Sequence, residues 1–391
     1  MHIDFTPEEK TLRSKLRSYL EVLMTPDLVA EVHEHEAGGP LYHSAMQALG
    51  RDGWLGLGWP EEHGGRGLGP IAEFIFFDEM HRAGFPIPLL TLCTVGPTLA
   101  THGTEAQRRE FLPRILAGTC HFSIAYTEPR AGTDLASLET RAVLEGDTYV
   151  VDGQKVFISL ASHADYFWLA ARTDPDVAKH RGISILMVPR DAPGVSSTPI
   201  QNLGDSDIHA VYFSSVRIPT SMRVGAENGG WRLITTQLNH ERVALMMVGP
   251  LIRFLEETTA WAGQTPAGGG GMLLDKPWVR RNLAEVSAQL EVLKLLNWRQ
   301  AWNLGRGRLT MEEASGIKVF GSEFYVEAYR LLMEIFGQAA VLRRDSPGGV
   351  LQGRLERHYR ATLVLTFGGG TNEVQRDIIA AAGLGLPRAA R

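Results

Sequence analysis

The spacing of the apolar residues changes twice along this chain. Up to about residue 119 they recur every three to four positions, as Leu12 and Leu16 do, which is the period of an amphipathic helix. Between residues 122 and 213 they gather in short runs rich in β-branched and aromatic residues, separated by turn residues. Beyond residue 230 the helical period returns in long segments. The sequence therefore predicts a helical, a β and a second helical region, in that order.

The ends of these elements carry local signals. Thr6-Pro7-Glu8-Glu9 and Thr104-Glu105-Ala106-Gln107 are capping boxes, which satisfy free N–H groups at the start of a helix. In the β region we expect an antiparallel sheet of short strands, with one of its turns at Asp152-Gly153. We assign an α+β fold with domains at 1–119, 120–229 and 230–391. The later helices are expected at Trp231–Ala262, Lys276–Leu304, Met311–Phe336, Val350–Leu365 and Glu373–Ala382.

Composition excludes several classes of protein. A chain of 391 residues that is 44% hydrophobic can build more than one packed core. Its 39 basic and 44 acidic residues give a net charge of −5, so it lacks the basic excess that binds nucleic acid. The longest run without charged residues, 83–104, contains glycines and prolines that would break a membrane helix, so we expect buried loop and helix there and no membrane span. Metal-binding and hydrolase motifs are missing, and we expect no metal site.

Two further features bear on where the protein works. The segment Met1–Glu9 has no cationic stretch followed by an apolar one, so we expect no secretory signal. Two cysteines, Cys93 and Cys120, are too few for a disulfide framework and are typical of a reducing compartment. We therefore expect a cytoplasmic protein with both cysteines packed inside. The run Gly268–Gly271 lacks the lysine and the strand of a phosphate-binding loop, and we interpret it as a flexible linker between helices.

Three segments contain the residue types of a polar binding site. Ile124–Asp134 opens the β region and places hydroxyls and backbone donors in one turn. Gly153–Ser159 puts an aromatic residue and a hydroxyl on a neighbouring strand, where both can flank one planar ligand. Thr366–Arg376 is a glycine turn that leads into a helix, whose free N–H groups can accept phosphate or carbonyl oxygens. Each signal is weak alone, whereas their order along one chain is specific.

Together these segments resemble the acyl-CoA dehydrogenase family over essentially the whole chain. Gln237–Leu245 and Thr366–Ile379 are most similar to actinobacterial members that act on CoA thioesters of sterol side chains. The resemblance implies FAD as cofactor, a CoA thioester as substrate, α,β-dehydrogenation, and a C-terminal domain built as a four-helix bundle. The motifs that carry it are Trp59-Pro60-Glu61-Glu62-His63-Gly64-Gly65, Tyr126-Thr127-Glu128-Pro129, Gly153-Gln154-Lys155, Glu241-Arg242 and the glycine turn before Gln375-Arg376.

The resemblance also implies which residues bind the cofactor. The Tyr126 backbone and the Thr127 hydroxyl would meet the flavin ring near its N5 atom. Phe157 stands where the family usually has a tryptophan stacked on the ring, and Ser159 replaces the usual threonine. The other implied cofactor-binding residues are Gly132 and Thr133 at the polar tail, and Gly368, Gly369, Gly370, Thr371 and Glu373 in the glycine turn.

The catalytic base of this family occupies one of two places. Many members carry a glutamate in the last glycine turn, directly before Gly-Thr, but this chain has Gly369 there, which cannot remove a proton. Other members carry the base on the first helix of the C-terminal domain, directly before an arginine. That position is Glu241 here, and we predict it as the base, with Arg242 as a substrate-binding residue. A salt bridge on the helix surface is the alternative role of Glu241.

The chemistry sets requirements for such a base. Removing a proton next to a thioester needs a carboxylate whose pKa is raised toward neutrality by burial. The thioester oxygen must be held by donors, which in this family are a ribityl hydroxyl of the flavin and a backbone N–H, while the β-hydride passes to N5. The missing side chain at Gly369 also enlarges the substrate pocket, which favours a bulky acyl group.

A second departure from the family concerns partners. Members that bind FAD across a two-fold interface usually carry Arg-x-x-Phe-Gly near the second C-terminal helix, and the matching region 274–281 lacks it. Either Arg280 or Arg281 substitutes, or another subunit supplies the arginine. The second option predicts an α₂β₂ hetero-oligomer with a related subunit, and a homo-oligomer is the alternative.

The expected electron acceptor is an electron-transfer flavoprotein or a similar protein. Two other functions stay open, a non-catalytic assembly subunit and an acyl-CoA oxidase.

Overall fold

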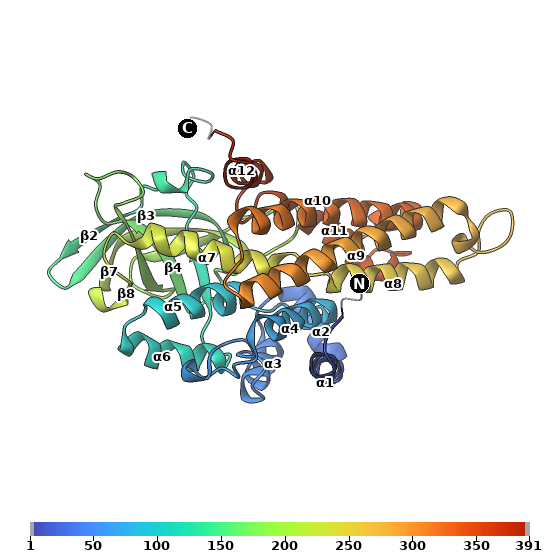
Figure 1. Cartoon of the computed structure of the whole chain (residues 1–391), viewed down its shortest axis with the longest axis horizontal. Coiled ribbons are helices and arrows are strands. Elements are labelled where there is room, and N and C mark those ends of the chain that lie inside the picture. Colours follow the sequence, from blue (N-terminus) through green and yellow to red (C-terminus); the bar gives the residue numbers. More distant parts are fainter. Residues whose placement is uncertain (1–3, 388–391) are drawn as a thin grey trace.

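The computed structural model describes residues 4–387, apart from the side chains of residues 238–245. Within this part helices, a sheet and further helices follow one another, as predicted. Figure 1 shows the strands gathered at one end of the molecule, with long C-terminal helices extending to the other end. The α+β fold is confirmed. We propose domain boundaries at residues 119 and 229, which lie in the connections between the three regions.

The N-terminal region is helical. Both predicted capping boxes form, because the Thr6 and Thr104 hydroxyls accept hydrogen bonds of 3.2 Å from the N–H groups of Glu9 and Gln107. The uncharged stretch 83–104 contains a π-helical turn and a short helix, and Cys93 is buried there. The elements are α1 (Pro7–Leu23), α2 (Pro26–His35), α3 (Pro40–Arg51), η1 (Glu61–His63), α4 (Gly69–Ala83), η2 (Thr91–Val95), α5 (Gly96–His102) and α6 (Glu105–Leu116).

The middle region is one sheet. Its strands follow the order β6-β7-β3-β2-β4-β5-β8, and β1 pairs with β4. The pairs are antiparallel except at β4, which pairs in parallel with β1 and, at one residue, with β2. The strands are β1 (Phe122–Ala125), β2 (Arg141–Glu145), β3 (Thr148–Ser159), β4 (Tyr166–Arg172), β5 (Ile183–Pro189), β6 (Val195–Pro199), β7 (Ile208–Pro219) and β8 (Arg223–Val224), with short turns η3 (Leu135–Ser137) and η4 (Thr220–Met222).

Strands β4 and β5 are buried on both faces. Phe167 and Leu169 of β4 belong to a hydrophobic core made only of residues from the β region. Trp168 and Ala170 belong to a second core, which includes the N-terminal helices. Because successive side chains of a strand point to opposite faces, one strand serves two cores. The sheet is thereby fixed to the helical region.

The predicted turn at Asp152-Gly153 is wrong. Strand β3 runs through both residues, and its register with β7 shifts between Val151 and Gly153. A Cβ at residue 153 would lie 2.5 Å from Oγ1 of Thr140, so glycine permits a close approach of the segment that precedes β2. The glycine therefore marks a bulge in a long strand and not the end of a short one.

The C-terminal region is helical, and α8, α9, α10 and α11 surround one core. Gly268–Gly271 lie in the connection between α8 and α9, as predicted. The elements are α7 (Gly230–Leu245), α8 (Gly249–Gln264), η5 (Leu273–Asp275), α9 (Pro277–Gly305), α10 (Met311–Phe336), η6 (Gly337–Val341), η7 (Val350–Gly353), α11 (Arg354–Thr362), η8 (Leu363–Thr366), α12 (Asn372–Ile378) and η9 (Ile379–Gly383).

The single helix predicted over 231–262 is wrong, because the chain breaks between α7 and α8. Pro250 has no N–H to donate inside a helix and instead stands in the first turn of α8. The N–H groups of Val248 and Gly249 donate to Oδ1 of the buried Asp78 at 2.9 and 2.7 Å. A carboxylate from α4 thus caps the new helix, and burial raises the pKa of Asp78 to about 6.

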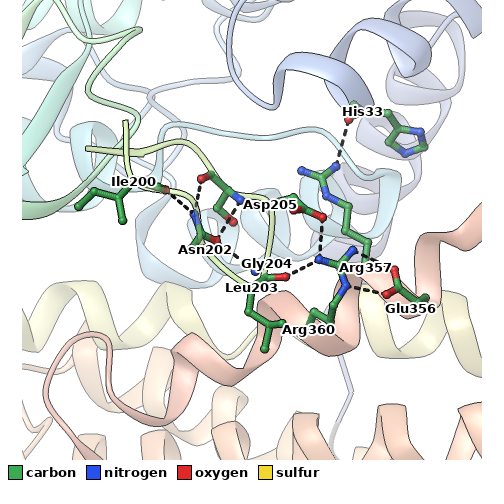
Figure 2. Close-up of polar contacts among 10 residues, drawn as sticks. His33, Ile200, Asn202, Leu203, Gly204, Asp205, Glu356, Arg357 and Arg360 are labelled. Atoms are coloured by element: carbon green, nitrogen blue, oxygen red, sulfur yellow. Dashed lines mark hydrogen bonds and ion pairs between the residues drawn. The ribbon is translucent and has the colours of Figure 1, made fainter. Parts of the chain in front are cut away.

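The loop 200–207 joins the sheet to the C-terminal helices (Figure 2). The Asn202 side chain holds the loop through the carbonyl of Ser206 at 2.7 Å and the N–H of Gly204 at 3.1 Å. Arg360 of α11 then donates to the carbonyl of Leu203 and, at 2.6 Å, to Asp205. A Cβ on Gly204 would lie 2.9 Å from the Cα of Ala361, so this contact requires glycine. The loop and α11 are therefore closely fitted.

Replacing Arg360 by methionine is expected to lower the free energy of unfolding by about 1–2 kcal/mol. The Arg360 side chain is 14% exposed, but Asp205 is half exposed and solvent screens that pair. The change is measured as a shift of the urea midpoint. Arg217→Met, which breaks an exposed ion pair to Glu145, is the control and should shift the midpoint little. Equal midpoints for Arg360→Met and the wild type would contradict the assignment of loop 200–207 as a domain contact.

His121, directly before β1, predicts a loss of stability in acid. Both of its ring nitrogens are buried without a hydrogen-bond partner in the described structure, and burial lowers its pKa to about 4. Between pH 6.5 and 4 the unfolded chain therefore binds a proton at this site that the folded chain does not, so stability falls as the pH falls. His121→Leu should make the slope of unfolding free energy against pH shallower by up to about 1.4 kcal/mol per pH unit. An unchanged slope would show that His121 titrates normally.

Candidate functional site

A lysine of β3 holds the segment that follows β1. The Lys155 ammonium donates to the carbonyl oxygen of Tyr126 at 2.9 Å and to Oε1 of Glu128 at 2.7 Å. The two oxygens of Glu128 also accept hydrogen bonds from the N–H groups of Glu139 and Thr140, at 2.6 and 2.9 Å. One buried ion pair therefore holds both ends of the segment 126–140.

The Lys155–Glu128 pair is charged although it is buried. The side chains of Lys155 and Glu128 are 0% and 5% exposed. Burial lowers the pKa of Lys155 to about 8, which is still above neutrality. Burial alone would raise the pKa of Glu128, but the ammonium and the N–H donors outweigh it and bring that pKa below its ordinary value. The pair therefore carries both charges near pH 7.

Phe157 and Ser159 lie at the end of β3 next to this segment. The N–H of Val156 donates to the carbonyl of Thr127 at 2.9 Å, which brings the first two predicted regions together. The register of β3 with β7 shifts between Lys155 and Ile158, and Phe157 has a positive φ of 60°. Phe157 is 64% exposed, and Ser159 is exposed as well. A bulky residue in this strained conformation, with its ring in solvent, is typical of a binding site.

Gly132 and Thr133 lie in the exposed loop after the turn formed by Glu128 and Ala131. A Cβ at Gly132 would meet nothing within 4 Å, so open space lies beside it. The Thr127 N–H, on the same segment, has no acceptor among the described residues. A planar ligand next to Phe157 could extend a polar tail into this space.

The glycine turn is built on α10. Lys318, which is 1% exposed, donates to the carbonyl of Gly370 and to Oδ1 of Asn372, both at 2.7 Å. Gly369 and Gly370 have positive φ values of 68° and 95°. Thr371 caps α12, and Glu373 is exposed in its first turn. The predicted residues 368–373 thus form one turn, but it belongs to a different part of the chain from Phe157.

The two groups of predicted residues are linked through loop 200–207. Ser159 pairs with Ile208, the first residue of β7, directly after the loop. Arg360, which contacts the loop, stands on α11, and this helix leads through η8 into the glycine turn. The loop and α11, whose contacts Figure 2 draws, are therefore connected along the chain to one group each.

The predicted base lies outside the residues whose side chains the structure describes. Glu241 and Arg242 belong to α7, and the last described side chain before them is Gln237. Gln237 is buried, donates to Oγ1 of Thr98 at 2.9 Å and accepts a hydrogen bond from the hydroxyl of Tyr126. Helix α7 is thus anchored to the segment that follows β1.

Three residues of this region escaped the sequence analysis. Gln237 and Lys155 were noted only as parts of motifs, and Lys318 was not noted. For Lys318, the available signal is its position among the apolar residues of a predicted helix. Such a position suggests that the lysine is buried, and a buried lysine requires partners. Its partners lie far away in the sequence, so the pattern alone did not identify them.

Among the described residues no group of three or more His, Cys, Asp or Glu could hold a metal ion. No helix in the described part of the chain has the length and apolar character needed to cross a membrane.

Comparison with known proteins defines the class. The models of the acyl-CoA dehydrogenase N-terminal, middle and C-terminal domains match residues 6–119, 123–216 and 228–384. Acyl-CoA dehydrogenases FadE26 and FadE29 of Mycobacterium tuberculosis are 52% and 49% identical, each over 100% of both chains. The fold and this order of domains define a three-domain oxidoreductase.

Solved structures agree with this class. The crystal structure of the ChsE4-ChsE5 complex from Mycobacterium tuberculosis contains a chain with a TM-score of 0.93 and 53% identity, over 100% of both chains. The structure described as Tcur3481-Tcur3483 steroid ACAD gives a TM-score of 0.94 and 48% identity, also over 100% of both chains. The chain described here belongs to the acyl-CoA dehydrogenase family, whose members are flavoproteins.

Proposed function

We propose that the chain is the catalytic subunit of an FAD-dependent dehydrogenase that introduces an α,β double bond into a bulky acyl-CoA thioester. The observation that carries the proposal is the exposed Phe157 ring, held at positive φ on a bulge with Ser159 nearby. An aromatic face beside hydroxyl and backbone donors suits a planar ring with polar edges. When bound, FAD supplies the acceptor for the hydride.

The residues present fit this cofactor. The Thr127 N–H, which has no acceptor in the described part of the chain, and the open space beside Gly132 can accommodate an oxygen-rich planar ring and its tail. In the glycine turn, the Gly370 and Thr371 N–H groups have no acceptor among the described residues. The residues proposed to hold FAD are Tyr126, Thr127, Gly132, Thr133, Phe157, Ser159, Gly368, Gly369, Gly370, Thr371 and Glu373.

Glu241 is proposed as the base that removes the α-proton. It follows Gln237 by four residues on α7, so the two positions share one face of the helix. Gln237 bonds Tyr126, which belongs to the segment proposed to hold the flavin. Gly369 provides no carboxylate at the alternative position. Arg242 is proposed to bind the substrate.

The relatives support a proposal for the substrate and the partner. One solved relative is described as a steroid ACAD, and both solved relatives are named as pairs of two chains. Together with the small residue at Gly369, this supports a sterol side-chain CoA thioester as substrate. It also supports an α₂β₂ assembly with a related subunit, working in the cytoplasm with an electron-transfer flavoprotein or a similar acceptor.

Mass spectrometry of the reaction product tests the proposal. The chain, co-purified with its partner subunit, is incubated with FAD, a dye acceptor and a sterol side-chain acyl-CoA. The thioester should lose two hydrogens, and a straight-chain acyl-CoA should react more slowly. An unchanged thioester mass would refute the activity. Product formation with oxygen but without dye would identify an oxidase instead.

A non-catalytic assembly subunit is the second candidate. Gly369 favours it, because the carboxylate found in many family members is missing there. Such a subunit would leave activity to its partner, so Glu241→Gln would not affect turnover by the assembly.

A further inference from the structure

Lys318 is a buried cation whose role the proposed reaction leaves open. It lies in the middle of α10, which packs against α12 (Figure 1). Its ammonium donates to the Gly370 carbonyl and to Oδ1 of Asn372, both at 2.7 Å. Burying a charge is unfavourable unless hydrogen bonds compensate it. The two hydrogen bonds to the glycine turn provide this compensation.

The contact with Gly370 fixes the direction of a peptide group. In a planar trans peptide the carbonyl and the following N–H point in opposite directions. Because the Gly370 carbonyl points toward Lys318, the Thr371 N–H points away from α10. The Gly369 carbonyl accepts a hydrogen bond of 3.3 Å from Nε2 of Gln375, so the Gly370 N–H points away from the Gln375 side chain. Neither N–H has an acceptor among the described residues.

Further contacts hold the turn in this arrangement. The Asn372 amide donates to Oγ of Ser322 at 3.0 Å and to Glu323 at 3.2 Å, so the group that Lys318 binds is itself fixed to α10. Gly370 has a φ of 95°, and a Cβ there would lie 2.7 Å from Nε2 of Gln375. Successive N–H groups in such a turn form a concave site for oxygen atoms.

The same arrangement occurs at Tyr126, directly after β1. Lys155 is also fully buried and binds the Tyr126 carbonyl, so the Thr127 N–H must point away from Lys155. That N–H likewise has no acceptor among the described residues. Two segments thus have a buried ammonium on one side of a peptide and, on the other, an N–H without an acceptor among the described residues.

We propose that Lys318 is a positioning residue, which holds the glycine turn so that the Gly370 and Thr371 N–H groups donate to an oxygen of the flavin cofactor. The inference rests on the proposed function. The oxygen belongs either to the diphosphate or to a ring carbonyl, both of which are acceptors. Lys318 itself does not touch the cofactor.

Equilibrium titration with FAD, followed by flavin fluorescence, tests this role on the flavin-free assembly of the full-length chain with its partner subunit. In Lys318→Met both hydrogen bonds to the glycine turn are lost and the peptide groups can rotate, so the Kd for FAD should rise at least about tenfold. Lys318→Gln keeps one donor and should give an intermediate Kd. Titration with riboflavin, which lacks the diphosphate, assigns the oxygen, since a loss for FAD alone identifies the diphosphate and a loss for both identifies the ring.

Asn282→Leu is the matched control. Asn282 of α9 is buried and donates to the Leu331 carbonyl at 3.2 Å and to Glu334 at 2.9 Å. These two partners lie on α10, about 20 Å along the helix from Lys318. This variant should lower the unfolding midpoint but leave the Kd for FAD within about twofold. An equal Kd in Lys318→Met and the wild type, or an equal rise in Asn282→Leu, would overturn the role of Lys318 and leave the proposed function intact. A wild-type assembly that binds neither flavin would overturn both.

Discussion

Glu241→Gln is expected to lower the rate of acyl-CoA oxidation about 10³-fold, because glutamine cannot accept the α-proton. This corresponds to about 4 kcal/mol of activation free energy. The change replaces one oxygen by nitrogen, so FAD binding and the unfolding midpoint should stay the same. The rate is measured with a dye acceptor on the assembled enzyme. Glu241→Asp keeps a carboxylate and should retain part of the activity.

The matched control for this variant is Glu291→Gln. Glu291 lies on the exposed side of α9 and pairs with Lys294, so its loss should leave the rate unchanged. Near-full activity of Glu241→Gln would remove Glu241 from the mechanism. The second candidate function, in which the chain only supports assembly, would then be favoured.

Lys155→Met is expected to lower the free energy of unfolding by about 3–5 kcal/mol. The variant leaves the Glu128 carboxylate buried without its cation, while Glu128 still accepts two backbone N–H bonds. Adding Glu128→Gln should recover part of the loss, because the second change removes the uncompensated charge. The measurement is urea unfolding of the two single variants, the double variant and the wild type. A double variant less stable than Lys155→Met alone would show that the charge is not the source of the loss.

The sequence predicts elements best where one segment carries its own period and end signals. Helix α10 has the predicted bounds, Met311–Phe336, and both capping boxes form. The errors occur where contacts from distant residues decide the conformation. Asp78 of α4 caps the helix that begins before Pro250, and Thr140 approaches β3 closely at Gly153. Neither contact can be read from the local pattern.

In the candidate site, too, local motifs are predictable from the sequence, whereas contacts between distant residues are not. The motif around Tyr126 and the motif around Phe157 are recognisable in the sequence, and the structure brings them together through Lys155 and Val156. The role of Lys318 depends on partners about 50 residues later in the chain, so a single sequence does not reveal it. The side chain of Glu241 lies outside the described residues, and its role remains a prediction.

Anaerobic stopped-flow spectroscopy is the most direct test of the central claim. The FAD-loaded assembly is mixed with a sterol side-chain acyl-CoA, and the flavin absorbance is followed without an electron acceptor. The account predicts rapid bleaching in the wild type and bleaching about 10³-fold slower in Glu241→Gln. Bleaching at equal rates in the two proteins, or no bleaching in the wild type, would contradict it.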